Sequence, residues 1–380
     1  MIGIILLGYN RIDSFKRAFN SLCAAYYPTN ERVDLILSID NSGSNDVENF
    51  SKEITWTHGE KIIRTFSVRQ GLRKHVLSCS EYFSTYEALI ILEDDICVAE
   101  DFFNYAMQAV SFYKNDNRVA GISLYSHSVY QENLMRFSPE VSIYDNYFIK
   151  YAASWGQIWM KNQFMDFFNW YEKFGDAELI KSDIPSMVKG WPETSWLKYH
   201  IAYCSVKNKY FVYPYHSLST NYADPGQHFA DSSNVYQVEL QKGICKKYSF
   251  AEIDNEYAVK YDAFFENEGL YDVFPDCAKL ILDVNGLRKY IPDDARFCLT
   301  TKKIDYKVVC SFGLVLRPIE ENVFSKINGN EIYLYDLSSA EKNTNNTNPE
   351  NSLWAYNCKG KSLPPKLFSY LFMKIKERFR

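Results

Sequence analysis

The chain has 380 residues, 47% of them hydrophobic and 23% charged, a composition that predicts a soluble globular protein with one large or two ordinary domains. Its formal net charge of −5 argues against a large basic surface for nucleic acid. Nine cysteines, an odd number without a CxxC pair, argue against a disulfide framework and a zinc site and favour a reducing compartment. The apolar N-terminal run "MIGIILLGYNR" is too short for a signal peptide or a membrane span. We therefore expect a cytoplasmic protein.

Short apolar runs, typical of buried parallel strands, recur in the N-terminal third of the chain. They lie at 2–8, 33–40, 61–68, 88–94 and 119–126. Between several of them the apolar spacing is helical: one face runs from Phe15 to Tyr26, with Asp13 or Ser14 as the expected N-cap, and another spans 102–113. This alternation predicts an α/β fold with a mostly parallel sheet flanked by helices.

Polar residues follow three of the predicted strands. "GYNR" at 8–11 ends the first run, "DNSG" at 40–43 ends the second, and Glu93, Asp94 and Asp95 end the fourth. In open α/β sheets, ligands bind beyond the carboxyl ends of the strands. Three adjacent carboxylates at such an edge predict a divalent cation, Mn²⁺ or Mg²⁺, which prefers oxygen ligands and shares them with substrate phosphates. The alternative is a solvated acidic turn that caps the next helix.

Changes in residue composition and in apolar spacing divide the chain into regions. We predict a catalytic domain over 1–245, with a nucleotide-binding half at about 1–125 and an irregular, Trp- and Tyr-rich half at 126–245. A small accessory α+β domain is expected over 246–338, with a helix near 256–265 and strands within 307–319 and 331–337. Residues 339–351 form a polar linker. The segment 352–380 ends in a basic amphipathic helix, which would either lie on an anionic membrane surface or dock on its own protein.

Several motifs, in order, resemble the GT-A fold of nucleotide-sugar-dependent glycosyltransferases. They are similar in detail to the inverting N-acetylglucosaminyltransferase I family and its bacterial surface-glycan relatives, over roughly residues 1–230. The motifs are "LLGYNR", "LSIDNSG", "GLRKHVLSCSEYF", "ILEDDICVAEDFFNY" and "YAASWGQIWMKNQF". The fourth is similar almost residue for residue to this family's variant of the DxD signature, and it is the most specific.

The resemblance implies roles for individual residues. Asp95 would coordinate the metal that bridges the donor diphosphate, Asp94 would contact the ribose or assist the metal, and Glu93 would reach the transferred sugar. Asp40 would hydrogen-bond the base, uracil in this family. The remaining implied residues of the nucleotide-binding and donor–acceptor pocket are Gly8, Tyr9, Asn10, Arg11, Asn41, Arg73, Lys74, Trp155 and Gly156. Lys74 stands where the family has His, and for Arg11 and Arg73 a surface salt bridge is the alternative.

The catalytic base is less clear from the motifs. The family places an acid just before a Trp, but here Ser195 precedes Trp196, so Glu193 is the first candidate, with Asp224 and Asp183 as alternatives. Glu193 would otherwise be a capping residue or a surface acid. His228, in "NYADPGQHF", is a second candidate metal ligand or diphosphate contact.

These observations favour a metal-dependent, inverting glycosyltransferase that moves a hexosyl or N-acetylhexosaminyl group from a nucleotide-sugar, expected to be UDP-linked. The expected acceptor is a bacterial surface glycan such as lipopolysaccharide or capsule, or its lipid-linked precursor at the inner membrane face. One alternative is a non-catalytic sugar-binding protein on the same fold. The other is a sugar nucleotidyltransferase, which "GYNRIDSFKR" argues against because it lacks the glycine-rich loop such enzymes use.

Overall fold

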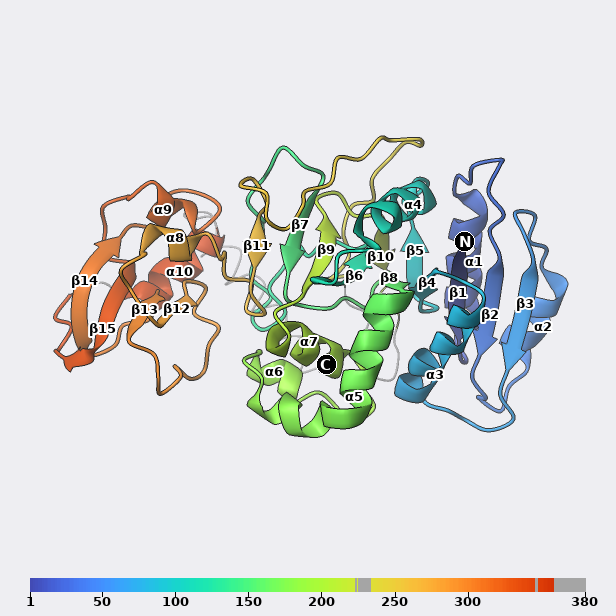
Figure 1. The fold of residues 1–380 in the computed structure, drawn as a ribbon, viewed down its shortest axis with the longest axis horizontal. Helices are drawn as coiled ribbons and strands as arrows, with labels where there is room; N and C mark the ends of the chain where they lie inside the picture. Colours follow the sequence, from blue (N-terminus) through green and yellow to red (C-terminus); the bar gives the residue numbers. More distant parts are fainter. Residues whose placement is uncertain (223, 225–233, 346–347, 359–380) are drawn as a thin grey trace, which may run out of the picture. The chain divides into compact units, whose positions relative to one another are not determined.

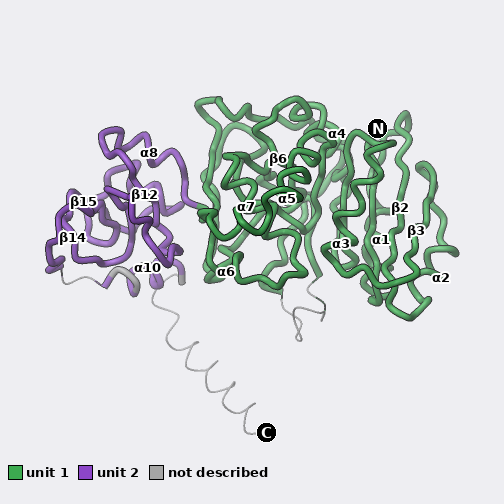
Figure 2. Tube along the Cα trace, turned by 60° about the horizontal axis from the view of Figure 1, so that its bottom comes forward, with its two compact units in different colours: residues 1–265 green, residues 266–380 purple. Residues whose placement is uncertain are grey.

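A computed structural model describes residues 1–222, 224, 234–345 and 348–358, and it divides into two compact units, Met1–Phe265 and Glu266–Arg380 (Figure 2). The second unit begins later than the predicted boundary between 245 and 246. The reason is that residues 246–265 complete the first unit: Tyr248, Phe250 and Ile253 lie in its hydrophobic core. Strand β11 (Lys260–Tyr261) also pairs with β7 (Asn146–Ile149).

The first unit is built on a nine-stranded sheet in the order β11-β7-β9-β6-β8-β4-β1-β2-β3 (Figure 1). Its other strands are β1 (Ile2–Gly8), β2 (Leu35–Ile39), β3 (Lys61–Thr65), β4 (Ala88–Leu92), β6 (Val119–Ser123), β8 (Gln157–Met160) and β9 (Tyr210–Pro214). Strands β3, β2, β1 and β4 are parallel neighbours, whereas β8 is antiparallel to both β4 and β6. The predicted α/β class, the mostly parallel sheet and the five predicted strands are confirmed.

The parallel register places four chain segments at one edge of the sheet. Gly8 lies opposite Ile39, Ile39 opposite Thr65, and Leu6 opposite Leu92. The residues that follow these strands, at 9–11, 40–43, 66–71 and 93–95, therefore emerge together. Because β1, β2 and β4 are almost entirely buried, the polar side chains of the site come from the segments that follow these strands.

Helices cover the sheet of the first unit. They are α1 (Ile12–Ala24), α2 (Asp46–Glu53), α3 (Leu72–Ser78), α4 (Phe102–Tyr113), α5 (Lys161–Lys181), α6 (Ser186–Lys189) and α7 (Leu197–Val206), with a 3₁₀ helix η1 (Cys79–Ser84). Helix α1 buries Phe15, Phe19 and Leu22 on the predicted face. Its predicted N-cap is wrong: the helix begins at Ile12 after Arg11, because Ser14 is buried and bonds to a distant carboxylate instead of to the helix terminus.

A second, two-stranded sheet reaches the acid residues. Strand β5 (Ile96–Val98) follows them directly and pairs antiparallel with β10 (Ser219–Asn221). As a result, the backbone N–H of Tyr222 donates to the carbonyl oxygen of Asp95 at 2.7 Å. This pairing brings a segment from far along the chain to the end of β4.

The second unit has a four-stranded sheet in the order β12-β13-β15-β14, which confirms the accessory α+β region. Its elements are α8 (Leu270–Val273), β12 (Leu280–Asp283), β13 (Phe297–Thr300), β14 (Tyr306–Phe312), α9 (Glu321–Phe324), β15 (Ile332–Ala340) and α10 (Pro349–Cys358). The predicted linker 339–351 overlaps the end of β15 and the start of α10. The helix expected at 256–265 is wrong, because those residues hold β11 and pair with the first sheet.

Two further findings bear on the expectations from composition. The eight cysteines whose side chains the structure describes are all free. None of the described helices combines the length and the apolar character needed to span a bilayer. The predicted basic helix of the tail falls within residues 359–380, outside the described residues.

Asp101 holds residues 245–248 in the first unit, and this role can be tested. Its carboxylate is fully buried and accepts bonds from the backbone N–H groups of Cys245 (2.7 Å) and Lys246 (3.2 Å) and from Tyr248 Oη (2.9 Å). We expect Asp101→Ala to lower the free energy of unfolding by about 3 kcal/mol, since it leaves several buried donors without an acceptor. Chemical denaturation checks this. The control is Asp13→Ala at an exposed position, which should change stability by less than about 0.5 kcal/mol. Equal effects of the two variants would contradict the assignment.

Candidate active site

The acid residues form the tight turn between β4 and β5. Asp94 is only 6% exposed, and Ile96 N–H closes the turn by donating to Glu93 O at 3.0 Å. The guanidinium of Arg11, from the loop after β1, meets them: its Nη2 donates both to Asp94 Oδ1 and to Asp95 Oδ2, the latter at 3.1 Å. A single nitrogen thus lies where two carboxylate oxygens converge.

The turn carries more negative charge than Arg11 offsets. Burial, with the neighbouring Asp95 and Asp94, raises the pKa of Glu93 to about 8. Burial also raises the pKa of Asp94 to about 6 and raises that of Asp95, although Arg11 opposes both shifts. Carboxylates crowded in this way favour protonation or a further cation.

Asp224 reaches the same place from the irregular segment just after β10. Its Oδ2 accepts bonds from Ser14 Oγ at 2.6 Å and from Arg17 Nη2, both on α1. Arg17 lies over the ring of Tyr222 at 4.3 Å, and Asp224 interacts electrostatically with Asp95. The structure therefore brings this predicted candidate to the acid turn.

Asp40 builds the neighbouring loop. Its buried carboxylate accepts backbone N–H bonds from Asn41 (2.8 Å), Gln70 (2.7 Å) and Gly71 (2.9 Å). Asn41 in turn donates from Nδ2 to Ser67 O at 2.8 Å. Both predicted residues thus fix the loop after β3 against the end of β2. A direct contact between Asp40 and a nucleobase stays a prediction.

The loop after β1 presents the residues of "GYNR". Gly8 is required by packing, because a Cβ there would lie 2.8 Å from the Phe15 ring. Asn10 is exposed and Tyr9 half-buried, with the guanidinium of Arg69 over the Tyr9 ring at 5.1 Å. Arg69 was missed from the sequence, where it stands in an unremarkable polar loop.

Arg73 and Lys74, on α3, differ in their surroundings. Arg73 Nη1 donates to the hydroxyls of Tyr199 (3.2 Å) and Tyr171 (3.5 Å), so its guanidinium is directed towards α7 and α5. Lys74 is exposed. Their predicted contact with a nucleotide stays a prediction.

Trp155 and Gly156 precede β8, which pairs with β4, so they lie beside the end of the strand that carries the acids. Gly156 has φ +85°, and a Cβ there would lie 2.8 Å from Ser219 Oγ, which explains the glycine. Trp155 packs edge-on against Tyr125, with ring centroids 4.8 Å apart, and contacts Tyr236 at 4.9 Å. This aromatic group forms one side of the region.

Two other predicted residues are not brought to the acid turn. Glu193 is exposed on the turn that precedes α7, where Ser195 N–H donates to Pro192 O at 2.9 Å. Asp183 is likewise exposed, just beyond α5. His228 lies outside the described residues.

Sequence reasoning also missed Ser14 and Arg17. Ser14 and Arg17 are three residues apart on α1, a spacing that places them on one face, and Arg11 directly precedes this helix. That regularity was a signal, but their partners come from two segments far along the chain. Only the fold could identify them.

A divalent cation fits this site only in part. In the portion of the chain that the structure describes, no three Asp, Glu, His or Cys side chains are grouped as metal ligands. Asp94 and Asp95 nevertheless converge on one positively charged atom, Arg11 Nη2. The donor set therefore fits a cation that takes one or two protein oxygens and completes its shell from a diphosphate and water.

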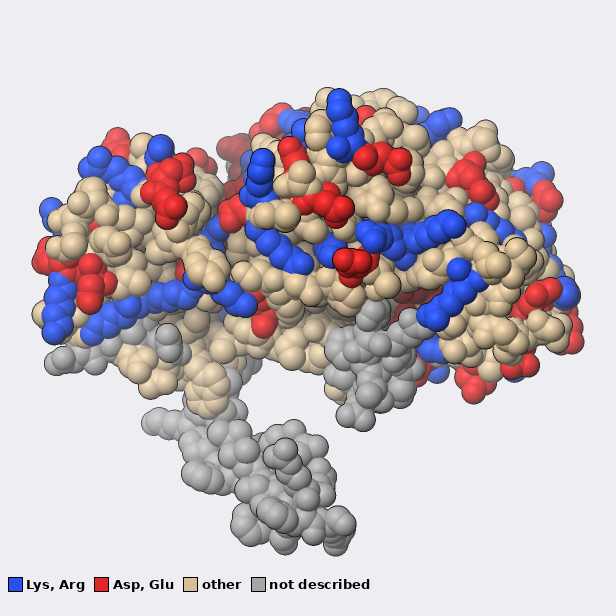
Figure 3. All heavy atoms as spheres, turned by 90° about the horizontal axis from the view of Figure 1, so that it is seen from below, with Lys and Arg blue, Asp and Glu red and all other residues tan. Residues whose placement is uncertain are grey.

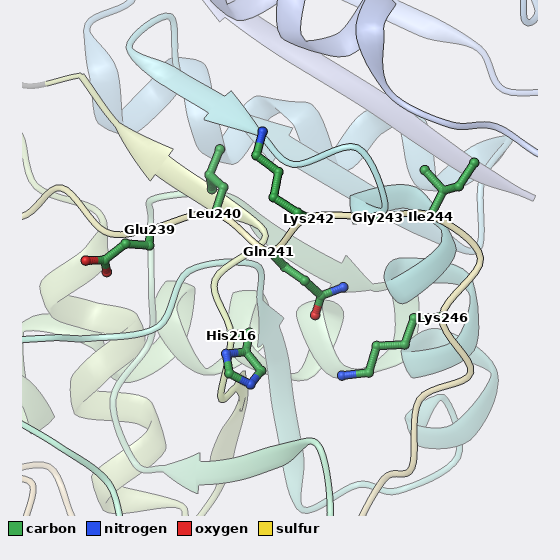
Figure 4. Close-up of a pocket in the computed structure, with 8 residues that line it drawn as sticks. All are labelled: His216, Glu239, Leu240, Gln241, Lys242, Gly243, Ile244 and Lys246. Atoms are coloured by element: carbon green, nitrogen blue, oxygen red, sulfur yellow. The ribbon is translucent and has the colours of Figure 1, made fainter.

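An open cavity of about 430 Å³ lies elsewhere on the first unit, lined by His216, Glu239–Ile244 and Lys246 (Figure 4). The side chains of His216, Gln241 and Lys246 point towards the same space, but Lys246 is paired with Asp145 at 2.7 Å. None of these residues belongs to the four loops at the sheet edge. On the face shown in Figure 3, basic and acidic side chains of the first unit are interspersed.

Comparisons with known proteins give a partial likeness. No protein-family model and no curated protein matches the chain. Among solved structures, it is similar to S. aureus TarS 1–349 in complex with UDP-GlcNAc, at 14% identity and a TM-score of 0.38, over 61% of each chain. It is also similar to the mannosyltransferase PcManGT from Pyrobaculum calidifontis in complex with GDP-Man and Mn²⁺, at 13% identity and a TM-score of 0.31, over 42% of this chain and 44% of that one. The chain thus spans less than two thirds of either structure. At these identities and TM-scores, the activities of the two proteins are not assigned to this chain.

The raised pKa values predict a pH-dependent stability. A carboxyl whose folded pKa lies above its unfolded pKa stabilises the native state when protonated, so this stability falls as pH rises from about 4.5 to about 8 for Glu93. In EDTA, we expect Glu93→Gln to be more stable than the wild type at pH 8, on the order of 2 kcal/mol, and equal to it near pH 4.5. Thermal melting across this range measures the difference. The exposed Glu53→Gln should show no such trend, and a pH-independent gap for Glu93→Gln would contradict the argument.

Proposed function

We propose that this protein is a metal-dependent, inverting glycosyltransferase of the GT-A type that uses a nucleotide-sugar, expected to be UDP-linked. The observation that carries the proposal is the convergence of Arg11, Asp94 and Asp95 at the carboxyl ends of adjacent parallel strands. Such an edge is where open α/β sheets bind nucleotides. The likeness of the acid turn to the DxD variant agrees with it.

The donor would lie across the loops after β1 to β4. Tyr9 with Arg69, and the loop that Asp40 holds, would face the nucleoside, while Arg11 and the acid turn would face the diphosphate. When bound, Mn²⁺ or Mg²⁺ would be held by Asp95 with Asp94 and would stabilise the charge that grows on the departing diphosphate. Glu93, the first residue of the turn, would reach the transferred hexosyl or N-acetylhexosaminyl group.

The base is better assigned to Asp224 than to Glu193. Asp224 is held beside the acid turn by Ser14 and Arg17, and both bonds are made by Oδ2. Among the described residues none bonds to its Oδ1, so that oxygen can accept the proton of an acceptor hydroxyl. Glu193, by contrast, is exposed on a separate turn.

The acceptor proposed is a bacterial surface glycan, or its lipid-linked precursor at the inner face of the membrane, with lipopolysaccharide and capsule as examples. Trp155 and its aromatic neighbours beside β8 offer apolar rings that suit the faces of a sugar. His228 and the basic tail remain predictions for the diphosphate and the membrane surface.

A non-catalytic nucleotide-sugar-binding protein is the second candidate, and the exposed position of Glu193 favours it. It requires that Asp224 is a structural partner of Arg17 and no base. Measured turnover of a nucleotide-sugar distinguishes the enzyme from the binding protein.

The donor site is tested by calorimetric titration of UDP, with GDP, CMP and dTDP as controls, with and without Mn²⁺. We expect wild-type protein to bind UDP only with the metal, and Asp95→Ala to weaken that binding by at least about tenfold because it removes a ligand of the cation. Asp13→Ala should bind as the wild type does. Metal-independent binding of UDP would remove the role given to Asp95.

The base is tested by the release of UDP from UDP-sugars with water as the acceptor. We expect Asp224→Asn to lower the rate by about 10²-fold or more while UDP affinity is kept, since proton transfer is lost. Glu193→Gln should stay within about threefold of the wild type, because that residue is exposed. The opposite ranking would make Glu193 the base, and no effect of either would favour the binding protein.

A further inference from the structure

Arg11 occupies the point that a cation on the acid turn would need. Its Nη2 alone contacts both Asp94 Oδ1 and Asp95 Oδ2. An ion that binds the same two oxygens would stand close to this nitrogen, and the positive charges of the ion and the guanidinium would repel each other at such a short distance. Arginine and a cation on these two carboxylates therefore exclude one another.

We infer that Arg11 is an exchangeable counter-ion of the acid turn. In the nucleotide-free protein it neutralises and positions Asp94 and Asp95, and it gives them up to the divalent cation that enters with the donor. The guanidinium is then freed to bind the donor's diphosphate. This inference rests on the proposed function.

The surroundings of Arg11 permit such an exchange. Its side chain is 25% exposed, against 7% for Asp94 and 20% for Asp95, so the arginine is the most solvent-accessible member of this group. Arg11 is the N-cap of α1, and its carbonyl oxygen accepts a bond from Phe15 N–H at 2.9 Å, so the helix holds its backbone while the side chain extends from the helix end. Its long side chain can turn away without movement of the strands.

The charges give the exchange its direction. One guanidinium contacts the two carboxylates of Asp94 and Asp95, so the pair keeps an excess of negative charge that a divalent ion offsets further. Once displaced, the guanidinium can form two parallel hydrogen bonds to phosphate oxygens. Arginine forms bonds of this kind with phosphates as well as with carboxylates. The diphosphate thereby replaces what Arg11 loses.

Arg17 supplies a matched control on the same helix. It is also an arginine paired with a carboxylate of this region, but its partner is Asp224 and not the acid turn. Its removal takes away one positive charge nearby and leaves the Arg11 contacts in place.

The test is a calorimetric titration of Mn²⁺ into nucleotide-free wild type, Arg11→Met, Arg11→Lys and Arg17→Met, with circular dichroism to verify folding. We expect Arg11→Met to bind Mn²⁺ at least about tenfold more tightly than the wild type, because its competitor is gone. Arg11→Lys, which keeps the charge, should fall between the two, and it serves if the methionine variant does not fold. At saturating Mn²⁺, both Arg11 variants should bind UDP more weakly than the wild type.

Three outcomes would overturn the inference. The first is that the Arg11 variants bind Mn²⁺ no more tightly than the wild type. The second is that Arg17→Met gains as much Mn²⁺ affinity as Arg11→Met, which would indicate a general effect of removing a positive charge. The third is that no variant binds Mn²⁺. The proposed function fails separately, by the absence of metal-dependent UDP binding to the wild type.

Discussion

The contact of Arg11 with Asp94 and Asp95 is the interaction on which the site depends. It exists because β1 and β4 are parallel neighbours, with Leu6 opposite Leu92, so the loop after one strand meets the turn after the other. Without a positive partner, the three acids would stand together at the end of a buried strand at a high cost in free energy. The acid turn therefore requires a positive partner, and in this structure Arg11 is that partner.

Around this contact, buried polar groups act as construction elements. Asp40 organises the loop after β3 through the backbone N–H groups of Gln70 and Gly71, and Asp101 anchors residues 245–248. The strands deliver these side chains to the edge, and the side chains then hold the loops still. Loops held by such bonds suit the proposed nucleotide site, because a preformed geometry lowers the entropy cost of binding.

The sequence predicted the parts of the fold that local patterns encode. Buried runs predicted the strands at 2–8 and 88–94, and helical spacing predicted α4, since burial sets the spacing of apolar residues. The predictions failed where pairing over long distances overrides local pattern. Residues 256–265 look helical, yet β11 pairs with β7. Ser14 suits an N-cap, yet it bonds to Asp224, 210 residues away.

The sequence by itself determined the class of the fold, the polar ends of the strands and the acid turn, because each depends on the pattern of residues within a short contiguous segment. The tertiary structure alone decided which residues share the site. It paired Arg11 with acids 83 and 84 residues later, brought Asp224 to α1 and left Glu193 on an exposed turn. The physical reason is that strand order and register, which depend on the packing of the whole sheet, set the distances between segments far apart in the chain.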